Sequence, residues 1–232
     1  MFRSCDARWT RVKTCTSEMI KVDDATKREG WSVKELLEQA CLRRNMYIVE
    51  KILKQETVCD TNIYLKYACK GGHLDIVNLL IERGATWWND GLYYACFGGH
   101  LDLAMLMIER GACRWNDGLR GACEGGHLDL VMLMIERGAN DWNAGLFYAC
   151  EGGHRDLAML MIERGACHWN YGLGCACFGG HLDLVMLMIE RGANDWNQGL
   201  RGARLGGHHK GQNRDIVKLM IQHGATNEAD IV

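Results

Sequence analysis

The chain has 232 residues, 48% of them hydrophobic and 24% charged, a composition that favours a folded protein over a disordered or fibrous one. Its 27 Lys and Arg residues and 29 Asp and Glu residues give a formal charge of -2, which provides no general attraction to nucleic acids or anionic membranes. Apolar runs such as residues 130–135 are far shorter than the ~20 residues that span a bilayer.

Residues 1–32 carry no repeat signal, and we expect them to form a polar arm or an N-terminal cap. Their first fifteen residues hold four basic groups and one acid without a following apolar segment, so no secretory signal is predicted. Six of the twelve cysteines recur at helix-core positions about one repeat apart, whereas a disulfide requires Cα atoms within about 7 Å. These features predict reduced thiols and a cytoplasmic or nuclear location.

A repeat of 27 residues occupies most of the chain. The tripeptide Gly-Gly-His begins at residues 71, 98, 125, 152, 179 and 206, and both Trp-Asn and Glu-Arg-Gly-Ala recur with the same spacing. A longer period is also present, since Gly-Ala-Cys-x-Trp-Asn alternates with Gly-Ala-Asn-Asp-Trp-Asn, which indicates growth by the copying of pairs. Such internal periodicity is the signature of a repeat array.

The period divides the rest of the chain into three regions. We expect residues 33–61 to form a degenerate capping repeat, residues 62–196 five regular repeats, and residues 197–232 a C-terminal repeat with five extra residues. In the degenerate copy Asn45 stands where His is expected, and its predicted core residues are Leu37, Ala40, Cys41, Ile48, Val49, Ile52 and Leu53. Both irregular ends suit caps, because a repeat array needs modified terminal units.

Residues 89–115 show how the first half of one unit folds. Leu92, Ala95 and Cys96 are spaced i, i+3 and i+4, which predicts a short first helix with a narrow face of small apolar residues. The glycine pair at residues 98–99 is expected to end this helix, because glycine adopts the left-handed conformation of helix C-caps.

The second helix of the unit is predicted to begin near Leu101, with Asp102 in its first turn, where the helix dipole favours a carboxylate. Arg110 and Gly111 are expected to end it. Its broad apolar face comprises Leu103, Ala104, Leu106, Met107 and Ile108. A single helix pair cannot bury these faces, so each pair must stack on the next and form a solenoid.

The pattern Leu-x-x-Ala-Cys-x-Gly-Gly-His-Leu-Asp-Leu-Val-x-Leu-Met-Ile-Glu-x-Gly-Ala resembles the ankyrin repeat, and the resemblance covers roughly residues 33–228. Ankyrin units have ~33 residues, whereas only seven positions lead from Ala112 to Leu119 here, so about six residues are missing where the family's β-hairpin would lie. The expected fold class is therefore all-α: an ankyrin-like solenoid of stacked helix-turn-helix repeats with β-hairpins reduced or absent. The shortened unit is similar to ankyrin proteins encoded by large DNA viruses of amoebae.

Each regular repeat places a Cys four residues before a His, as in Cys96 and His100, a spacing that can serve zinc or a nucleophile with its base. A glycine pair intervenes, and the copies stand about one repeat apart, whereas a zinc site gathers four ligands around one ion. An active site likewise gathers dissimilar groups in one cleft. We therefore expect no catalytic residue, metal site or cofactor, with Cys as a small core residue and His hydrogen-bonded to a neighbouring turn.

Three further rows recur with the repeat. The Trp row is expected to seal the junction that lost its hairpin, because Trp buries a large area. The Asn row, which consists of Asn89, Asn116, Asn143, Asn170 and Asn197, is expected to cap the first helices. The Glu-Arg pairs are expected to form a solvated charged face.

Function is expected where the copies differ, because stacking explains the identical positions. The predicted partner-binding residues are Tyr93, Tyr94, Phe97, Arg120, Glu124, Phe147, Tyr148, Glu151, Phe178 and Arg201. Aromatic residues and Arg carry much of the energy at protein interfaces, and the resemblance implies binding over the concave face lined by first helices. An alternative is that some of these rings pack between neighbouring helices.

The sequence thus predicts a monomeric, non-catalytic scaffold or adaptor that binds a protein partner rather than nucleic acid or a membrane. Two alternatives stay open. One is a structural component that self-assembles or belongs to a virion, and it would use the irregular ends for its contacts. The other is metal binding through the Cys-His pairs.

Overall fold

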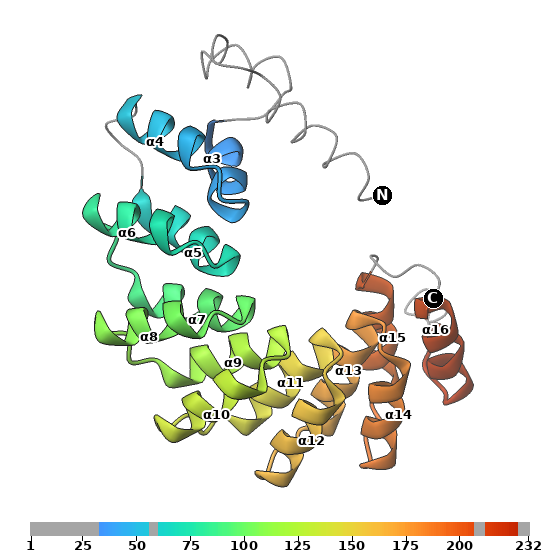
Figure 1. The fold of residues 1–232 in the computed structure, drawn as a ribbon. Helices are drawn as coiled ribbons and strands as arrows, with labels where there is room; N and C mark the ends of the chain where they lie inside the picture. Colours follow the sequence, from blue (N-terminus) through green and yellow to red (C-terminus); the bar gives the residue numbers. More distant parts are fainter. Residues whose placement is uncertain (1–32, 56–59, 207–211, 227–232) are drawn as a thin grey trace.

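The computed structural model describes residues 33–55, 60–206 and 212–226. These residues form helices and no strands, and the helices follow one another in pairs along a curved array (Figure 1). The all-α solenoid is the fold class that the sequence predicts. The predicted N-terminal arm (1–32) and part of the predicted five-residue insertion between His208 and Asp215 lie outside the described residues.

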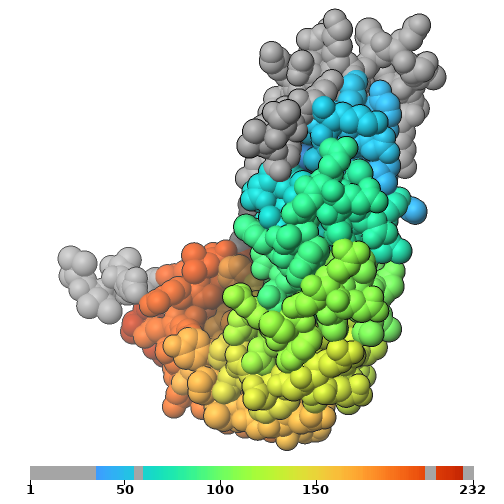
Figure 2. All heavy atoms as spheres, turned by 90° about the vertical axis from the view of Figure 1, so that its left-hand side faces the viewer, coloured from blue at the N-terminus to red at the C-terminus, as the bar shows by residue number. Residues whose placement is uncertain are grey.

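Each pair consists of a first helix on the inner side of the curve and a second helix on its outer side (Figure 1). The first helices are α3 (Val33–Leu42), α5 (Thr61–Gly71), α7 (Trp88–Gly98), α9 (Trp115–Gly125), α11 (Trp142–Gly152), α13 (Trp169–Gly179) and α15 (Trp196–Leu205). The second helices are α4 (Met46–Gln55), α6 (Leu74–Glu82), α8 (Leu101–Glu109), α10 (Leu128–Glu136), α12 (Arg155–Glu163), α14 (Leu182–Glu190) and α16 (Gln212–Gln222). Seen from the side, the array has the outline of a crescent (Figure 2).

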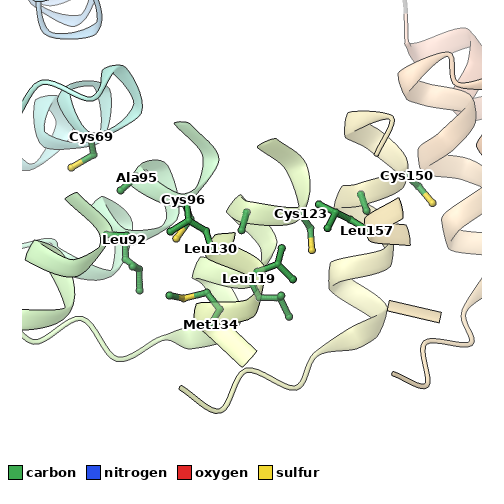
Figure 3. Packing of buried hydrophobic residues seen from close by; sticks show 14 of the residues in the cluster. Cys69, Leu92, Ala95, Cys96, Leu119, Cys123, Leu130, Met134, Cys150 and Leu157 are labelled. Carbon is green, nitrogen blue, oxygen red and sulfur yellow. The ribbon is translucent and has the colours of Figure 1, made fainter. Parts of the chain in front are cut away.

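The core lies between the two layers of helices and runs without interruption along the array. In α7 the predicted face of Leu92, Ala95 and Cys96 is fully buried, and in α8 Leu103 and Met107 are buried with it. The equivalent side chains of the next repeats continue this row (Figure 3). The core residues predicted for the degenerate copy, all seven of them, are buried as well. Each pair therefore covers the apolar face of its neighbour, which is the energetic basis of a solenoid.

The curvature follows from the unequal size of the side chains in the two layers. Neighbouring pairs contact each other mainly through their first helices, whose packing faces carry Gly, Ala and Cys. At Gly98, an added Cβ would lie 2.4 Å from the carbonyl oxygen of Lys70 in the preceding repeat. Because the second helices carry larger Leu and Met residues, they stay further apart, and the array bends towards the first helices.

Two junctions are closer than the others, those between α7 and α9 and between α13 and α15. In both cases the seventh residue of the later helix is a glycine, Gly121 or Gly202, whereas Tyr148 and Cys175 occupy this place in α11 and α13. A Cβ on Gly202 would lie 2.3 Å from the carbonyl oxygen of Gly174. The missing side chain therefore sets the distance between the helices.

Replacing Gly202 with Ala is expected to force α13 and α15 apart and to lower the free energy of unfolding by roughly 1–3 kcal/mol, the usual cost of overpacking. Thermal unfolding followed by circular dichroism measures the effect. Gly174→Ala is the matched control, because its added Cβ would meet only the flexible side chain of Gln198, at 3.1 Å. Equal midpoints for the two variants would contradict this account of the junction.

The Gly-Gly-His tripeptide interlocks neighbouring repeats. His100 donates from Nε2 to the carbonyl oxygen of Lys70 at 3.1 Å, and its ring covers Gly72, where an added Cβ would lie 2.4 Å from the ring. Gly72 also adopts the left-handed conformation (φ 76) that ends α5. The same histidine bond recurs at His73, His154 and His181. The predicted hydrogen bond from His to a neighbouring turn is thereby confirmed.

The prediction that the Asn row caps the first helices is wrong. The regular first helices begin at Trp, so Asn is their second residue. The N-cap is the residue that precedes this Trp, as Asp141 precedes Trp142. The Asn143 side-chain oxygen instead accepts hydrogen bonds from the backbone N–H groups of Cys167 (2.9 Å) and His168 (3.1 Å) in the next repeat. The remaining members of the row make equivalent bonds, with a single bond at Asn197. Asn thus ties the start of one first helix to the loop that precedes the next first helix, in the region of the lost hairpin.

The Glu-Arg rows also do more than face solvent. The guanidinium carbon of Arg110 lies 6.0 Å from the ring centre of Trp88, at a distance that permits a cation–π interaction. The same contact joins Arg137 to Trp115 and Arg164 to Trp142. These tryptophans are partly buried against the core. Arginine therefore covers the outer part of the ring that the junction leaves open.

Asn143→Ala is expected to destabilise the junction between α11 and α13 by about 1 kcal/mol, because two backbone N–H groups lose their acceptor. The amide hydrogens of Cys167 and His168 should then exchange faster with solvent, as measured by NMR. Asn78→Ala provides the control, since Asn78 is exposed on helix α6. Unchanged exchange at both amides in the Asn143 variant would show that this bond does not hold the loop.

Candidate partner-binding surface

The residues that differ between the first helices of successive repeats gather on the inner face of the array. With Trp as the first residue of a regular first helix, the buried Leu, Ala and Cys occupy places 5, 8 and 9. Places 3, 6, 7 and 10 follow the same helical spacing and lie on the other side of the helix. We call the residues at these four places of α5 to α15 the variable surface. It contains every partner-binding residue that the sequence predicts.

The predicted residues differ in how far they reach solvent. Most of them are half-buried, namely Tyr93, Tyr94, Phe97, Arg120, Glu124, Phe147, Tyr148 and Glu151. Phe178 and Arg201 are exposed. The alternative that rings pack between helices holds in part, since Tyr94 and Tyr148 pack against the core cluster. Each of these side chains nevertheless keeps some of its surface on the inner face.

A tyrosine and a glutamate connect α7 and α9 at the centre of this surface. The Tyr93 hydroxyl donates a hydrogen bond to the Glu124 carboxylate. The Tyr93 ring also meets the Tyr94 ring edge to face, with centroids 5.0 Å apart. Burial, followed by the hydrogen bond to Glu124, raises the pKa of Tyr93 well above its ordinary value. Tyr93 therefore remains a hydroxyl donor across the physiological pH range.

Arg120 makes ion pairs within the array. Its guanidinium group lies 3.2 Å from a carboxylate oxygen of Asp117 and 3.1 Å from one of Asp141. The hydrogen bond to Asp141 is the largest influence on Arg120 and raises its pKa. Asp141 also accepts from the backbone N–H of Ala144 and so caps α11. Arg120 consequently fixes α9 against the start of α11 as well as contributing charge to the variable surface.

Aromatic side chains of α11 and α13 form a second group. The Phe147 ring centre lies 5.5 Å from that of Tyr171 and 6.3 Å from that of His168. Tyr171 occupies the third place of α13, which the sequence reasoning did not consider. The repeat register was the available signal, because the third place varies among the copies as the sixth and tenth do.

An open groove of about 480 Å³ lies where α11, α13 and α15 meet. Its walls include Glu151, Tyr171, Phe178, Arg201 and Leu205. Burial raises the pKa of the Glu151 carboxyl, and the charge of Glu124 raises it further. The groove thus combines apolar walls with a carboxylate that is partly withdrawn from water.

The sequence reasoning also missed three residues of α5. The Lys70 ammonium nitrogen lies 4.2 Å from the ring centre of Phe97, and that of Lys66 lies 4.9 Å from the ring centre of Tyr67. Counting 27 residues back from the predicted Tyr93, Tyr94 and Phe97 leads directly to these positions. Their role in the variable surface was therefore open to prediction from the repeat.

The Cys and the His of each Cys-His pair lie in different surroundings. Cys96 is fully buried, and burial raises the pKa of its thiol to about 12, as it does for Cys69 and Cys123. Such thiols stay protonated near neutral pH, whereas a metal ligand or nucleophile must be a thiolate. The His100 Nε2 atom is engaged with a backbone carbonyl. In the described part of the chain, no three His, Cys, Asp or Glu residues come together as a group that could hold a metal ion.

Thiol reactivity tests this arrangement. At pH 7.4 we expect iodoacetamide to modify the exposed Cys113 and Cys167 in the folded protein, while Cys96 and its buried equivalents stay unmodified. The buried thiols should stay unmodified even at pH 9, because burial raises the pKa of Cys96 and Cys123 to about 12 and raises that of Cys150 as well. Peptide mapping by mass spectrometry gives the extent of modification. Equal modification of Cys96 and Cys113 would contradict the burial of the Cys row.

The match to a protein-family model agrees with the helical repeat. A family model of the ankyrin repeat matches residues 64–90, which cover most of α5, all of α6 and the start of α7. Among solved structures, the chain is similar to the human ASB11 ankyrin repeat domain, with 19% identity, 82% of this chain and 98% of that chain covered, and a TM-score of 0.46. No curated protein has a sequence that matches the chain. The fold and the family match define an all-α solenoid that contains an ankyrin repeat at residues 64–90.

Ankyrin repeats generally mediate protein–protein interactions, and the proteins built from them are generally non-catalytic binding scaffolds. Within the described ranges, every helix is too short or too polar to cross a membrane.

Proposed function

We propose that the chain is a non-catalytic adaptor that binds another protein through the variable surface of its inner face. The observation that carries this proposal is that, within each repeat, the residues that stack on neighbouring helices and the residues that face solvent on the inner side are different sets. The identical residues Leu, Ala, Cys, Gly and His make the contacts between neighbouring helices. The residues of the first helices that differ between repeats remain on one continuous face, where aromatic and charged groups stay accessible.

The proposal assigns the partner contacts to the ten predicted residues, together with Lys66, Lys70, Tyr171 and Leu205. Aromatic rings provide large contact areas at little entropic cost, and neighbouring charges select the partner. The exposed thiols Cys113 and Cys167 fit a reducing compartment, so we place the protein inside a cell, in the cytoplasm or the nucleus. The short repeat unit supports an origin in a large DNA virus of amoebae, with the host cell as that location.

A structural role in a self-assembling or virion-associated particle is the second candidate. Leu205, near the end of the last first helix, has 68% of its surface exposed and offers an apolar contact to another copy. Multi-angle light scattering distinguishes the two functions. A monomer mass that stays constant with concentration is expected for the adaptor, whereas a mass that rises with concentration supports self-assembly.

Affinity purification with mass spectrometry tests the adaptor. We expect the double variant Phe97→Ala and Phe178→Ala to recover about tenfold less of the specific partner than the unmodified chain, because interface aromatics are common hot spots. The matched control is Met132→Ala with Met186→Ala, which removes two exposed hydrophobic side chains from second helices on the outer side. If the control variant loses the partner and the inner-face variant retains it, the binding surface lies elsewhere.

A further inference from the structure

The tenth residues of the first helices form a row along the inner face. The earlier members of this row interact with other side chains of the array. The ammonium group of Lys70 lies over the ring of Phe97. The hydroxyl of Tyr93 donates to the carboxylate of Glu124. The row therefore already shows two kinds of contact, a cation on an aromatic face and a donor on a carboxylate.

The next two members of the row, Glu151 and Phe178, have neither contact. Among the residues that the structure describes, no hydrogen bond or ion pair reaches the Glu151 carboxylate, and no cation covers the Phe178 ring. Phe178 is 37% exposed. Burial and the neighbouring Glu124 raise the pKa of Glu151, which indicates that its negative charge lacks compensation. A carboxylate and an aromatic face thus stand in adjacent repeats without the positive charge that both favour.

Both residues line the groove between α11, α13 and α15, which is large enough for one long side chain. Gly174 and Gly202 also line the groove, at the sixth and seventh places, where α11 carries Phe147 and Tyr148. The exposed Tyr171 and Leu205 provide further apolar wall.

The charges that face this groove favour a cation. Glu151 and Asp195 line it together with Arg201, and Glu124 adds a further negative charge near Glu151. The lining itself therefore carries two carboxylates and one guanidinium group. Arg201 stands on α15, at the sixth place, whereas Glu151 belongs to α11.

We propose that this groove binds an arginine side chain of the protein partner, an inference that rests on the proposed function. The planar guanidinium group stacks on the Phe178 or Tyr171 ring and pairs with the Glu151 carboxylate, for which its two parallel N–H donors are suited. Apolar residues next to that arginine in the partner pack against Leu205. A lysine carries its charge on a single nitrogen without a planar face. It therefore cannot stack on an aromatic ring and also pair with the carboxylate through two parallel N–H donors.

N-acetyl-arginine amide and N-acetyl-citrulline amide are the probes, because citrulline has nearly the same shape without the charge. Titrations followed by NMR of the labelled protein report on the backbone amides of Gly174 and Gly202. We expect saturable shifts of these two signals with the arginine derivative and an affinity about tenfold lower with the citrulline derivative. The absence of saturable shifts, or equal affinities for the two probes, would overturn the proposal.

Variants identify the carboxylate. Glu151→Gln is expected to lower the affinity for the arginine derivative to that for citrulline, while Glu109→Gln removes the same charge from the exposed end of α8 and should leave both affinities unchanged. Equal behaviour of the two variants would show that the effect is one of net charge, and the site would be refuted.

The outcome for the groove can be separated from that for the adaptor. If the purified partner is lost with the Phe97 and Phe178 double variant but retained by Glu151→Gln, the adaptor is supported and the arginine site is wrong. If the arginine derivative binds as described and no partner depends on the inner face, the site stands and the proposed function fails.

Discussion

The close approach of successive first helices is the constraint on which the structure depends. Backbone meets backbone at these junctions, since an added Cβ at Gly98 or Gly202 would lie within 2.4 Å of a carbonyl oxygen of the preceding helix. Only small residues tolerate such packing, which explains why Gly, Ala and Cys repeat so strictly. The larger residues of the second helices then bend the array and place the first helices on its inner side.

This constraint also determines which residues are available for binding. One side of each first helix is committed to stacking, and places 3, 6, 7 and 10 remain on the other side. Glycine has two separate effects there. Gly202 brings α15 close to α13, and Gly174 and Gly202 both line the groove. A position without a side chain can thus contribute to a binding surface as much as an aromatic ring does.

The sequence was sufficient for the helix pairs, their buried faces and the histidine bonds, because each depends on a spacing within one repeat or on the glycine beside it. It was insufficient for Asn143 and Arg110. Asparagine at the start of a helix has the same local preference whether it caps that helix or accepts from the next loop, and only the stacking distance decides between them. Arg110 reaches Trp88 across the helix pair, a contact that no local spacing encodes. The groove likewise required the positions of three helices.

The histidine hydrogen bonds all run in one direction along the array, from a repeat to the repeat before it in the sequence. Each ring reaches back to the repeat before it, so that His100 bonds the carbonyl of Lys70 and covers Gly72. During translation the N-terminal repeat leaves the ribosome first, and folding proceeds as segments emerge. Every histidine is therefore made after the backbone group that it bonds, so the histidine contact between two repeats depends on no residue that is still to be translated.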